Sequence, residues 1–588
     1  AFNPEWDAMH LDRTYRAIER DKNHACVIIW SLGNEASNGT VFRKTYAWIK
    51  DRDKSRPVQY EQAKDGEGTD IFCPMYYTIE KMEEYAKRDN ITKPLIQCEY
   101  NHAMGNSTGN LKEYWELIRK YKVLQGGFIW DWVDQGILTK NEDGIPYYAY
   151  GGDFNSRNYH SDENFCNDGL IWPNRVAGPQ MPEVKKAYQN IHFEAIDLSK
   201  GEIIVKNEFS FINLSDYYFV WELKKNGSIV EKGTFNLQTP AMTDQKVTIS
   251  YTAKVNQEQG DEYFLSVTAY TANTQLLVAK DYPVAFDQFM IGESQLFNKK
   301  QIAGNTPFQV IKNEKNNISL KRGEIEVTFG DMGLRSLRKG DTEYFAATPE
   351  PNFWRAPNDN DFGNDSYKKL NIWKTAGINR SLVNEPQITT NGNDQIVKFN
   401  YMLNDVVCTL RADGSINVSV EFEPKRDNLP EMVRLGLLYA LKKEFNLVEY
   451  YGRGPGENYV DRCASTPIGI YSTTVKDMFT PYLRPQENGN RTEVRWIKLS
   501  NDKGDKITIR GDQPLSFSAL NYKAEDLDPG LTKKQQHLSD LYPRNEVYLT
   551  VDLFQKGVAG TNTWGAQPLD KYRYPAKKYN YSFNITID

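Results

Sequence analysis

Hydrophobic and polar residues follow two alternating patterns over the first 190 residues. Short runs of apolar and β-branched residues occur at 27–32, 57–60, 70–76, 95–100 and 127–133. Stretches with helical spacing separate these runs: Leu11, Tyr15 and Ile18 recur at i, i+4 and i+7, and a second such stretch covers 111–121. Strand and helix in repeated succession predict parallel βα units.

The βα units indicate part of a (β/α)8 barrel. Chemically capable side chains cluster at the C-terminal ends of the predicted strands, where such a barrel has its active site. Only five strands are predicted, whereas a closed barrel has eight and typically ~250 residues. The sequence also begins on a helix. We therefore expect residues 1–193 to form the C-terminal part of a TIM barrel whose first strands precede residue 1. An open five-stranded α/β sheet is the alternative.

The pattern changes after residue 193 to an alternation with a period of two. It is seen at 201–206, 217–224 and 262–270, and turn signals such as the KNG at 225–227 interrupt it. Residues 194–288 are therefore predicted to form an immunoglobulin-like β-sandwich. Longer strands with Gly- and Asn-rich turns predict one large β-sandwich over 289–588.

Composition narrows the possible partners. The net charge is −6 and no basic cluster stands out, which argues against nucleic acid. The longest apolar runs, such as 26–30, are too short to span a membrane. Aromatic residues make up 13% of the chain, which fits β-rich cores or carbohydrate binding, and composition alone favours the cores. The six cysteines form no CxxC pair, so zinc and thioredoxin-like sites are excluded and free thiols are expected.

Two acidic residues stand at the ends of predicted strands. Glu35 ends the segment WSLGNE, and Glu99 follows the apolar run before EYNH. Asn34 and Glu35 would also suit a helix N-cap and first turn. An acid at the end of a buried strand must, however, be paired, protonated or functional. Two such acids on different strands of one barrel can converge, and paired carboxylates are the usual means of cleaving a glycosidic bond.

Other polar and aromatic side chains lie at the same strand ends. Asn34 could bond a substrate hydroxyl. Tyr76 could donate a hydrogen bond that keeps Glu99 ionised, or it could be a core tyrosine. His102 is an isolated histidine, for which a structural role is the usual one. Trp130 and Trp132 point the same way on a strand and serve either core packing or a sugar platform.

Several motifs resemble those of a known family. The segment WSLGNEASNG at 30–39 resembles the acid/base motif of glycoside hydrolase family 2, and IQCEYNHAMGNS at 96–107 resembles the nucleophile motif of its β-galactosidases. Similar β-galactosidase patterns occur at 126–135, 150–154, 165–170, 355–361, 454–459 and 479–482.

The resemblance implies a multidomain fold and a function. The implied order is the second part of a TIM barrel, an immunoglobulin-like domain and a large mutarotase-like β-sandwich, the β-galactosidase small chain. The implied reaction is hydrolysis of terminal non-reducing β-D-galactose with retention, through a covalent galactosyl-enzyme. Glu35 would be the acid/base and Glu99 the nucleophile. The implied substrate-pocket residues are Asn34, Tyr76, His102, Trp130 and Tyr548, the last standing where the family has a tryptophan.

The resemblance also implies metals and an assembly. Glu35 would ligate Mg²⁺ with partners from an earlier segment. A Na⁺ ion would be held by Phe165 and Asp168, although Asp168 replaces the family's asparagine. The full-length protein is expected to bind β-galactosides and to form a homo-oligomer, without nucleic acid or membrane as partners. A soluble protein is expected, cytoplasmic or periplasmic, and the absent N-terminus leaves the compartment undecided.

Two alternatives remain. One is a family 2 hydrolase of another β-glycoside, such as a β-glucuronidase, against which the NHAMGNS run after Glu99 argues. The other is a non-catalytic carbohydrate-binding or assembly fragment, because the family's N-terminal domain and first barrel strands are not in this sequence.

Overall fold

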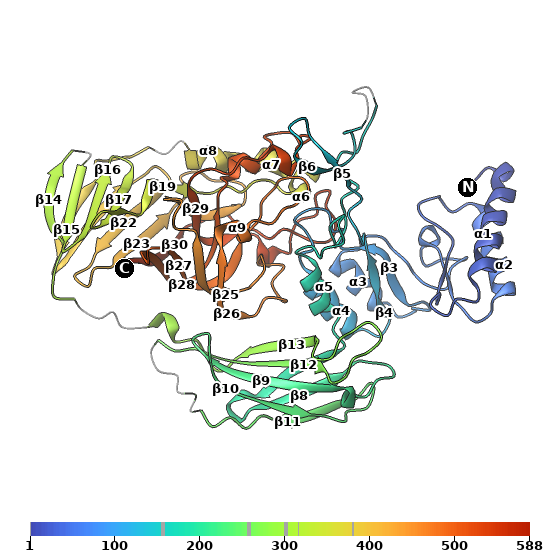
Figure 1. The fold of residues 1–588 in the computed structure, drawn as a ribbon. Helices are drawn as coiled ribbons and strands as arrows, with labels where there is room; N and C mark the ends of the chain where they lie inside the picture. The colour runs from blue at the N-terminus through green and yellow to red at the C-terminus, as the bar shows by residue number, and fades with distance from the viewer. Residues whose placement is uncertain are drawn as a thin grey trace.

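A computed structural model describes residues 2–588, apart from 155–158, 254, 256–259, 299–303, 316 and 379–380. The described chain forms three parts (Figure 1): an N-terminal βα segment, a small β-sandwich and a large β-rich part. Within the βα segment, the N-terminal helices α1 and α2 stand at the end of the molecule that is remote from the large part.

The βα segment has the five parallel strands that the sequence predicts. β1 pairs with β2, Gln59 bridges Ile71, Phe72 bridges Leu95, and β3 pairs with β4, all in parallel. The elements are α1 (Asp7–Asp21), β1 (Trp30–Ser31), α2 (Thr40–Arg52), β2 (Val58–Gln59), α3 (Ile79–Ala86), β3 (Leu95–Tyr100), α4 (Leu111–Lys120), β4 (Leu124–Ile129), β5 (Ile137–Lys140), β6 (Pro146–Ala149) and α5 (Met181–Ala187). The apolar face of α4 is buried beneath this array, as its helical spacing predicts.

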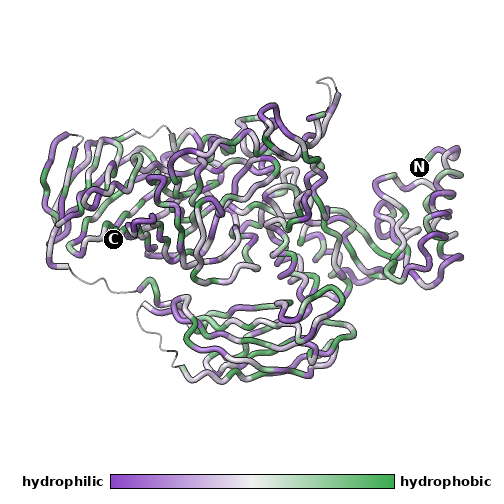
Figure 2. Tube along the Cα trace, viewed as in Figure 1, coloured by the Kyte–Doolittle hydropathy of each residue, from purple (hydrophilic) through white to green (hydrophobic). Residues whose placement is uncertain are grey.

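The second part is a sandwich of two antiparallel sheets. Its strands are β7 (Ile191–Asp197), β8 (Glu202–Asn207), β9 (Tyr217–Lys225), β10 (Ser228–Asn236), β11 (Asp244–Thr248), β12 (Tyr263–Thr271) and β13 (Pro283–Met290). One sheet has the order β10-β9-β12-β13 and the other β11-β8-β7. Residues alternate between buried and partly exposed along β9 and β12, and hydrophobic and hydrophilic residues intermingle along the strands (Figure 2). The predicted period of two is confirmed.

The third part holds most of the β structure. A five-stranded sheet contains β14 (Gln309–Glu314), β15 (Asn317–Arg322), β16 (Ile325–Gly330), β17 (Gly333–Lys339) and β18 (Thr342–Glu343). A twelve-stranded sheet contains β19 (Phe345–Asn352), β20 (Gln387–Asn391), β21 (Asp394–Asn400), β22 (Asn404–Leu410), β23 (Ile416–Phe422), β24 (Arg434–Leu441), β25 (Leu447–Arg453), β26 (Ile468–Thr474), β27 (Arg491–Ser500), β28 (Lys506–Leu520), β29 (Val547–Gln555) and β30 (Tyr579–Ile587). Buried side chains from both sheets form one hydrophobic core.

The described residues of the large part also form five short α-helices. The helices are α6 (Asp359–Gly363), α7 (Ser366–Leu370), α8 (Ile372–Ile378), α9 (Val475–Met478) and α10 (Ala524–Leu527). No helix in the described residues has both the length and the apolar character needed to cross a bilayer. The six cysteines are free thiols, as expected.

Candidate active site

Three residues within four positions of the ends of the parallel strands adopt the left-handed backbone conformation. Glu35 follows β1 with φ 45°, Tyr76 follows the 71–72 strand segment with φ 50°, and Asn101 follows β3 with φ 53°. Non-glycine residues rarely adopt this conformation, and such positions concentrate at functional sites. The strand ends that the sequence singles out therefore share a local geometry as well as an edge of the sheet.

Glu99 and Tyr76 form a direct hydrogen bond. The Tyr76 hydroxyl donates to Oε2 of Glu99 at 2.6 Å, and the Tyr76 backbone N–H donates to the Glu99 carbonyl at 2.8 Å. The pKa of Glu99 is raised because its carboxyl group is partly buried; the Tyr76 bond lowers that pKa, and the negative charge of Glu35 raises it further. The expected hydrogen bond is present, but burial outweighs it.

An aromatic cluster lies beside this pair. His102 is buried and stacks on Phe165, with ring centres 5.2 Å apart. Trp564, from the large part, meets Tyr76 edge-on at 4.6 Å and His102 at 5.3 Å. Trp564 remains 42% exposed, so part of its indole is free to contact a ligand. The geometry resembles a sugar platform, in which ring C–H groups pack on an aromatic face.

His102 is fixed from both sides. Its Nδ1 is hydrogen-bonded to the Thr563 hydroxyl at 2.6 Å, and its Nε2 lies 3.5 Å from Oδ2 of Asp168. A histidine held between a hydroxyl and a carboxylate has a defined ring orientation. The ring is thus held in place beside the aromatic cluster.

The remaining predicted residues are placed differently. Asn34 is exposed beside Glu35, and Trp130 is 39% exposed with its carbonyl accepting the Ala103 N–H at 2.8 Å. Tyr548 does not join them: it is buried in β29, and its hydroxyl donates to Glu546 at 3.1 Å.

Trp564 lies where Tyr548 was expected. Tyr548 lies on the strand β29, whereas the residue that reaches the cluster, Trp564, comes from the loop that follows β29. One sequence signal could have identified it: a tryptophan within the polar run TNTWG has no apolar neighbours to pack against.

The loop after β3, residues 101–110, is held by the large part. The Asn106 N–H donates to Oε1 of Gln486 at 2.9 Å, and Arg462 donates to the Ser107 carbonyl at 2.5 Å. Four further bonds are Asn106 Nδ2 to Glu487 O (2.7 Å), Asn358 Nδ2 to Asn106 O (3.1 Å), Gly109 N to Ala559 O (2.7 Å) and Asn110 N to Asp461 O (2.7 Å). The loop that carries His102 thus depends on residues that are distant in sequence.

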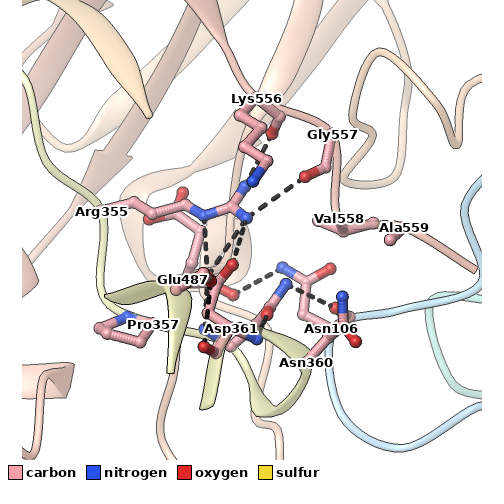
Figure 3. A network of polar contacts seen from close by, with 12 residues as sticks. Asn106, Arg355, Pro357, Asn360, Asp361, Glu487, Lys556, Gly557, Val558 and Ala559 are labelled. Atoms are coloured by element: carbon pink, nitrogen blue, oxygen red, sulfur yellow. Dashed lines mark hydrogen bonds and ion pairs between the residues drawn. The ribbon is translucent and has the colours of Figure 1, made fainter. Parts of the chain in front are cut away.

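The loop that carries Trp564 is held by the same network (Figure 3). Buried Arg355 pairs with Asp361 at 3.2 Å and donates to the carbonyls of Lys556 at 2.7 Å and Gly557 at 3.2 Å. Asp461 accepts the next two N–H groups, Val558 at 3.0 Å and Ala559 at 2.7 Å. Buried charges therefore fix both loops that meet at the cluster.

The site has one feature that suits a cation. Oδ1 of Asp168 is buried without a hydrogen-bond partner, and oxygen is the ligand that hard cations prefer. Asp168 therefore offers a ligand oxygen that would suit a small cation. No group of three or more His, Cys, Asp or Glu side chains in the described ranges could hold a metal ion.

The chain matches three families in succession. Residues 1–193 match "Glycosyl hydrolases family 2, TIM barrel domain", residues 203–292 match "Beta-galactosidase, domain 4", and residues 321–585 match "Beta galactosidase small chain". A β-galactosidase of Priestia megaterium is 35% identical over 99% of this chain and 56% of its own length. One of Pseudoalteromonas haloplanktis is 32% identical over all of this chain and 59% of its own length.

The chain thus spans somewhat more than half the length of these relatives. A solved Parabacteroides merdae β-glucuronidase aligns with 73% of this chain and 51% of its own at 11% identity and a TM-score of 0.24, too low to bear on function.

Proposed function

The chain belongs to the β-galactosidases of glycoside hydrolase family 2, and on this basis we propose that the complete protein hydrolyses terminal, non-reducing β-D-galactose residues with retention. The observation that carries the proposal is the hydrogen bond between Tyr76 and Glu99 at a strand end. The negative charge of Glu35 also raises the pKa of this Glu99 carboxylate. Two interacting acids at strand ends of one parallel array are the equipment of a glycosidase.

The two acids take different roles in the proposed reaction. The Glu99 carboxylate attacks the anomeric carbon while Glu35 gives a proton to the departing glycosidic oxygen, so that the C–O bond breaks as the glycosyl ester forms. Glu35 then removes a proton from water, whose oxygen attacks the anomeric carbon and releases Glu99. Tyr76 stabilises the ionised nucleophile. Two inversions leave the product with its original configuration.

Residues of the aromatic cluster would bind and orient the sugar. Trp564 would offer its exposed indole to the C–H face of galactose, and Asn34, His102 and Trp130 would contact other edges of the ring. Tyr548 is not proposed for this role. Asp168 and the Phe165 carbonyl would hold Na⁺, and Glu35 would contribute to Mg²⁺; such cations neutralise charge beside the sugar and the acid/base.

The proposal extends to architecture. We infer that the βα segment forms the second part of a (β/α)8 barrel, since the five parallel strands leave their array incomplete. An immunoglobulin-like sandwich and a mutarotase-like β-sandwich are the proposed classes of the second and third parts.

A substrate panel tests the activity. The complete polypeptide, with whatever sequence accompanies this chain, should release nitrophenol from p-nitrophenyl β-galactoside and leave the β-glucuronide and α-galactoside intact. Preference for the β-glucuronide would assign another family 2 specificity, and inertness toward every glycoside would indicate a binding protein.

A crystal structure tests the stereochemistry. In a retaining enzyme the two carboxyl groups lie about 5–5.5 Å apart. We expect this separation between Glu35 and Glu99, and a value near 8 Å would indicate inversion instead.

A further inference from the structure

A cavity lies between the βα segment and the large part. Its volume is about 520 Å³, and it is bounded by residues 172–182 on one side and by parts of β25, β26 and the loops around them on the other. None of its lining residues belongs to the cluster around Glu99 and Trp564. The volume falls in the range of ~300–1,000 Å³ that is usual for small-molecule sites.

Arg491 supplies a positive charge to this cavity. The side chain is only 4% exposed, and its Nε donates to the Tyr450 hydroxyl at 3.2 Å and the Pro455 carbonyl at 3.0 Å. One terminal amino group donates to the carbonyls of Gly489 and Asn490, whereas the other makes no hydrogen bond to any described residue. A guanidinium buried in this way still has a donor available to a ligand.

No carboxylate of the described chain pairs with Arg491. Every other fully buried arginine of the large part that lies near the βα segment has an acidic partner: Arg355 has Asp361, Arg434 has Glu487, Arg462 has Glu457 and Arg484 has Asp359. Glu457 also lines the cavity, but its oxygens already accept from Arg462, Tyr482 and the Gly489 N–H. A buried cation without an anion is costly, so an external anion would be stabilised here.

The rest of the lining suits a ring that carries an anionic group. Trp172, Tyr471 and Phe479 supply aromatic surface, and Thr466 and Thr480 supply hydroxyl groups. The exposed carboxylate of Asp477 also lines the cavity. It accepts a hydrogen bond from the hydroxyl group of the residue that caps its helix. Aromatic faces bind the C–H surface of a sugar, and a guanidinium binds carboxylate or phosphate.

We propose that this cavity is a second ligand site, separate from the proposed catalytic one, which binds a sugar bearing an oxyanion. Arg491 contacts the carboxylate or phosphate, and the aromatic side chains pack on the ring. Both a uronic acid and a sugar phosphate present this chemistry.

Calorimetric titration of the full chain tests the proposal with galacturonate, galactose 6-phosphate, neutral galactose and inorganic phosphate as probes. At least one anionic sugar should bind about tenfold more tightly than galactose. The two anionic sugars together distinguish the carboxylate from the phosphate as the preferred group. Binding of inorganic phosphate alone, or equal binding of galactose, would overturn the proposal.

Two variants assign the binding to this cavity. Arg491→Gln should abolish it. Because that change also removes bonds to backbone carbonyls, Gly456→Phe serves as a second test: Gly456 lines the cavity, and a Cβ there meets no atom within 4 Å. The phenyl ring should fill the cavity while Arg491 keeps all of its bonds.

The matched control is Arg510→Gln, which removes an exposed arginine from β28 that has no ion pair in the described residues. This control should bind like the wild type. If Gly456→Phe still binds the anionic sugar, the binding site lies elsewhere and the assignment to this cavity is refuted.

Discussion

At the scale of single residues, Glu35 and Glu99 have unequal surroundings. Glu99 is partly buried and bonded to Tyr76, whereas Glu35 is exposed to solvent. A glycosidase needs two carboxyl groups with different protonation behaviour, and environment is what separates them. The exposed acid can exchange protons with water, and the enclosed one can attack.

Replacing Tyr76 by phenylalanine should impair the nucleophile. The change removes the donor that lowers the pKa of Glu99, so that pKa should rise. Since only ionised Glu99 attacks, the acidic limb of the kcat/KM profile of the complete protein should move to higher pH, and kcat/KM at neutral pH should fall about tenfold or more. Tyr77→Phe, which alters the adjacent residue, is the control, and an unmoved limb in Tyr76→Phe would contradict the role.

Glutamine substitutions should separate the two acids. Glu99→Gln should abolish turnover of every galactoside. Glu35→Gln should slow hydrolysis of lactose by ~10²–10⁴-fold but affect activated phenyl galactosides less, because a good leaving group needs little protonation. Azide should rescue Glu35→Gln and yield the β-galactosyl azide. Rescue of Glu99→Gln to the α-azide, with Glu35→Gln unaffected, would exchange the roles.

The sequence could predict some of these contacts and not others. Tyr76 and Glu99 end consecutive strands of a parallel array, so their hydrogen bond follows from the strand pattern. The bond between His102 and Thr563 joins residues 461 positions apart. Periodicity reports which face a residue occupies within its own element, and carries no information about which distant loop will cover it. Trp564 was missed for the same reason.

At the scale of elements, several acidic side chains lie close together around the segment that follows β4. Asp134 accepts the Gly169 N–H at 2.8 Å and is 4% exposed. Burial raises its pKa to about 8, with help from the neighbouring Asp168 and Asp131 charges. In the folded protein Asp134 therefore keeps its proton at a pH where the unfolded chain has released it.

Asp134→Asn should change the pH dependence of stability. Between about pH 4, the ordinary pKa of an aspartate, and pH 8, the folded state binds one proton more than the unfolded state, so the free energy of unfolding falls as pH rises. The loss is at most about 1.4 kcal/mol per pH unit. Asparagine retains the acceptor for Gly169 and removes the titration.

Chemical unfolding of the chain at pH 4.5, 6 and 8 measures this effect. The stability advantage of Asp134→Asn over the wild type should widen with pH, while exposed Asp143→Asn stays parallel to the wild type. A constant difference between Asp134→Asn and the wild type would mean that Asp134 is ionised throughout.

The elements themselves were largely predictable. The five strands and the helices of the βα segment obey the apolar periodicities, as do β9 and β12 of the sandwich. The branching of the twelve-stranded sheet, where β25, β26 and β27 leave the main path, could not be read from alternation. Alternation fixes which side chains face inward, but it does not select the neighbouring strand.

At the scale of the whole molecule, the βα segment depends on the large part. The 101–110 loop is bonded by residues of the large part, including Arg462 and Gln486. An isolated fragment of residues 1–193 would lack all of these partners. It would also keep apolar side chains such as Ile28 and Phe128, which are 70% and 59% exposed. Expressed alone, 1–193 should aggregate or bind a hydrophobic dye strongly. A monodisperse product with a cooperative melting transition would contradict this dependence.

The anchoring of the 101–110 loop has a consequence for synthesis. A ribosome makes Gly109 and then adds 450 further residues (559 − 109) before Ala559, the partner of its N–H, exists. At about 5–20 residues per second, that interval lasts roughly 20–90 s. Throughout that interval, only water can bond the Gly109 N–H in the loop that carries His102. The 101–110 loop therefore obtains this native partner only after most of the following chain has been made, so the growing chain is a natural client for chaperones.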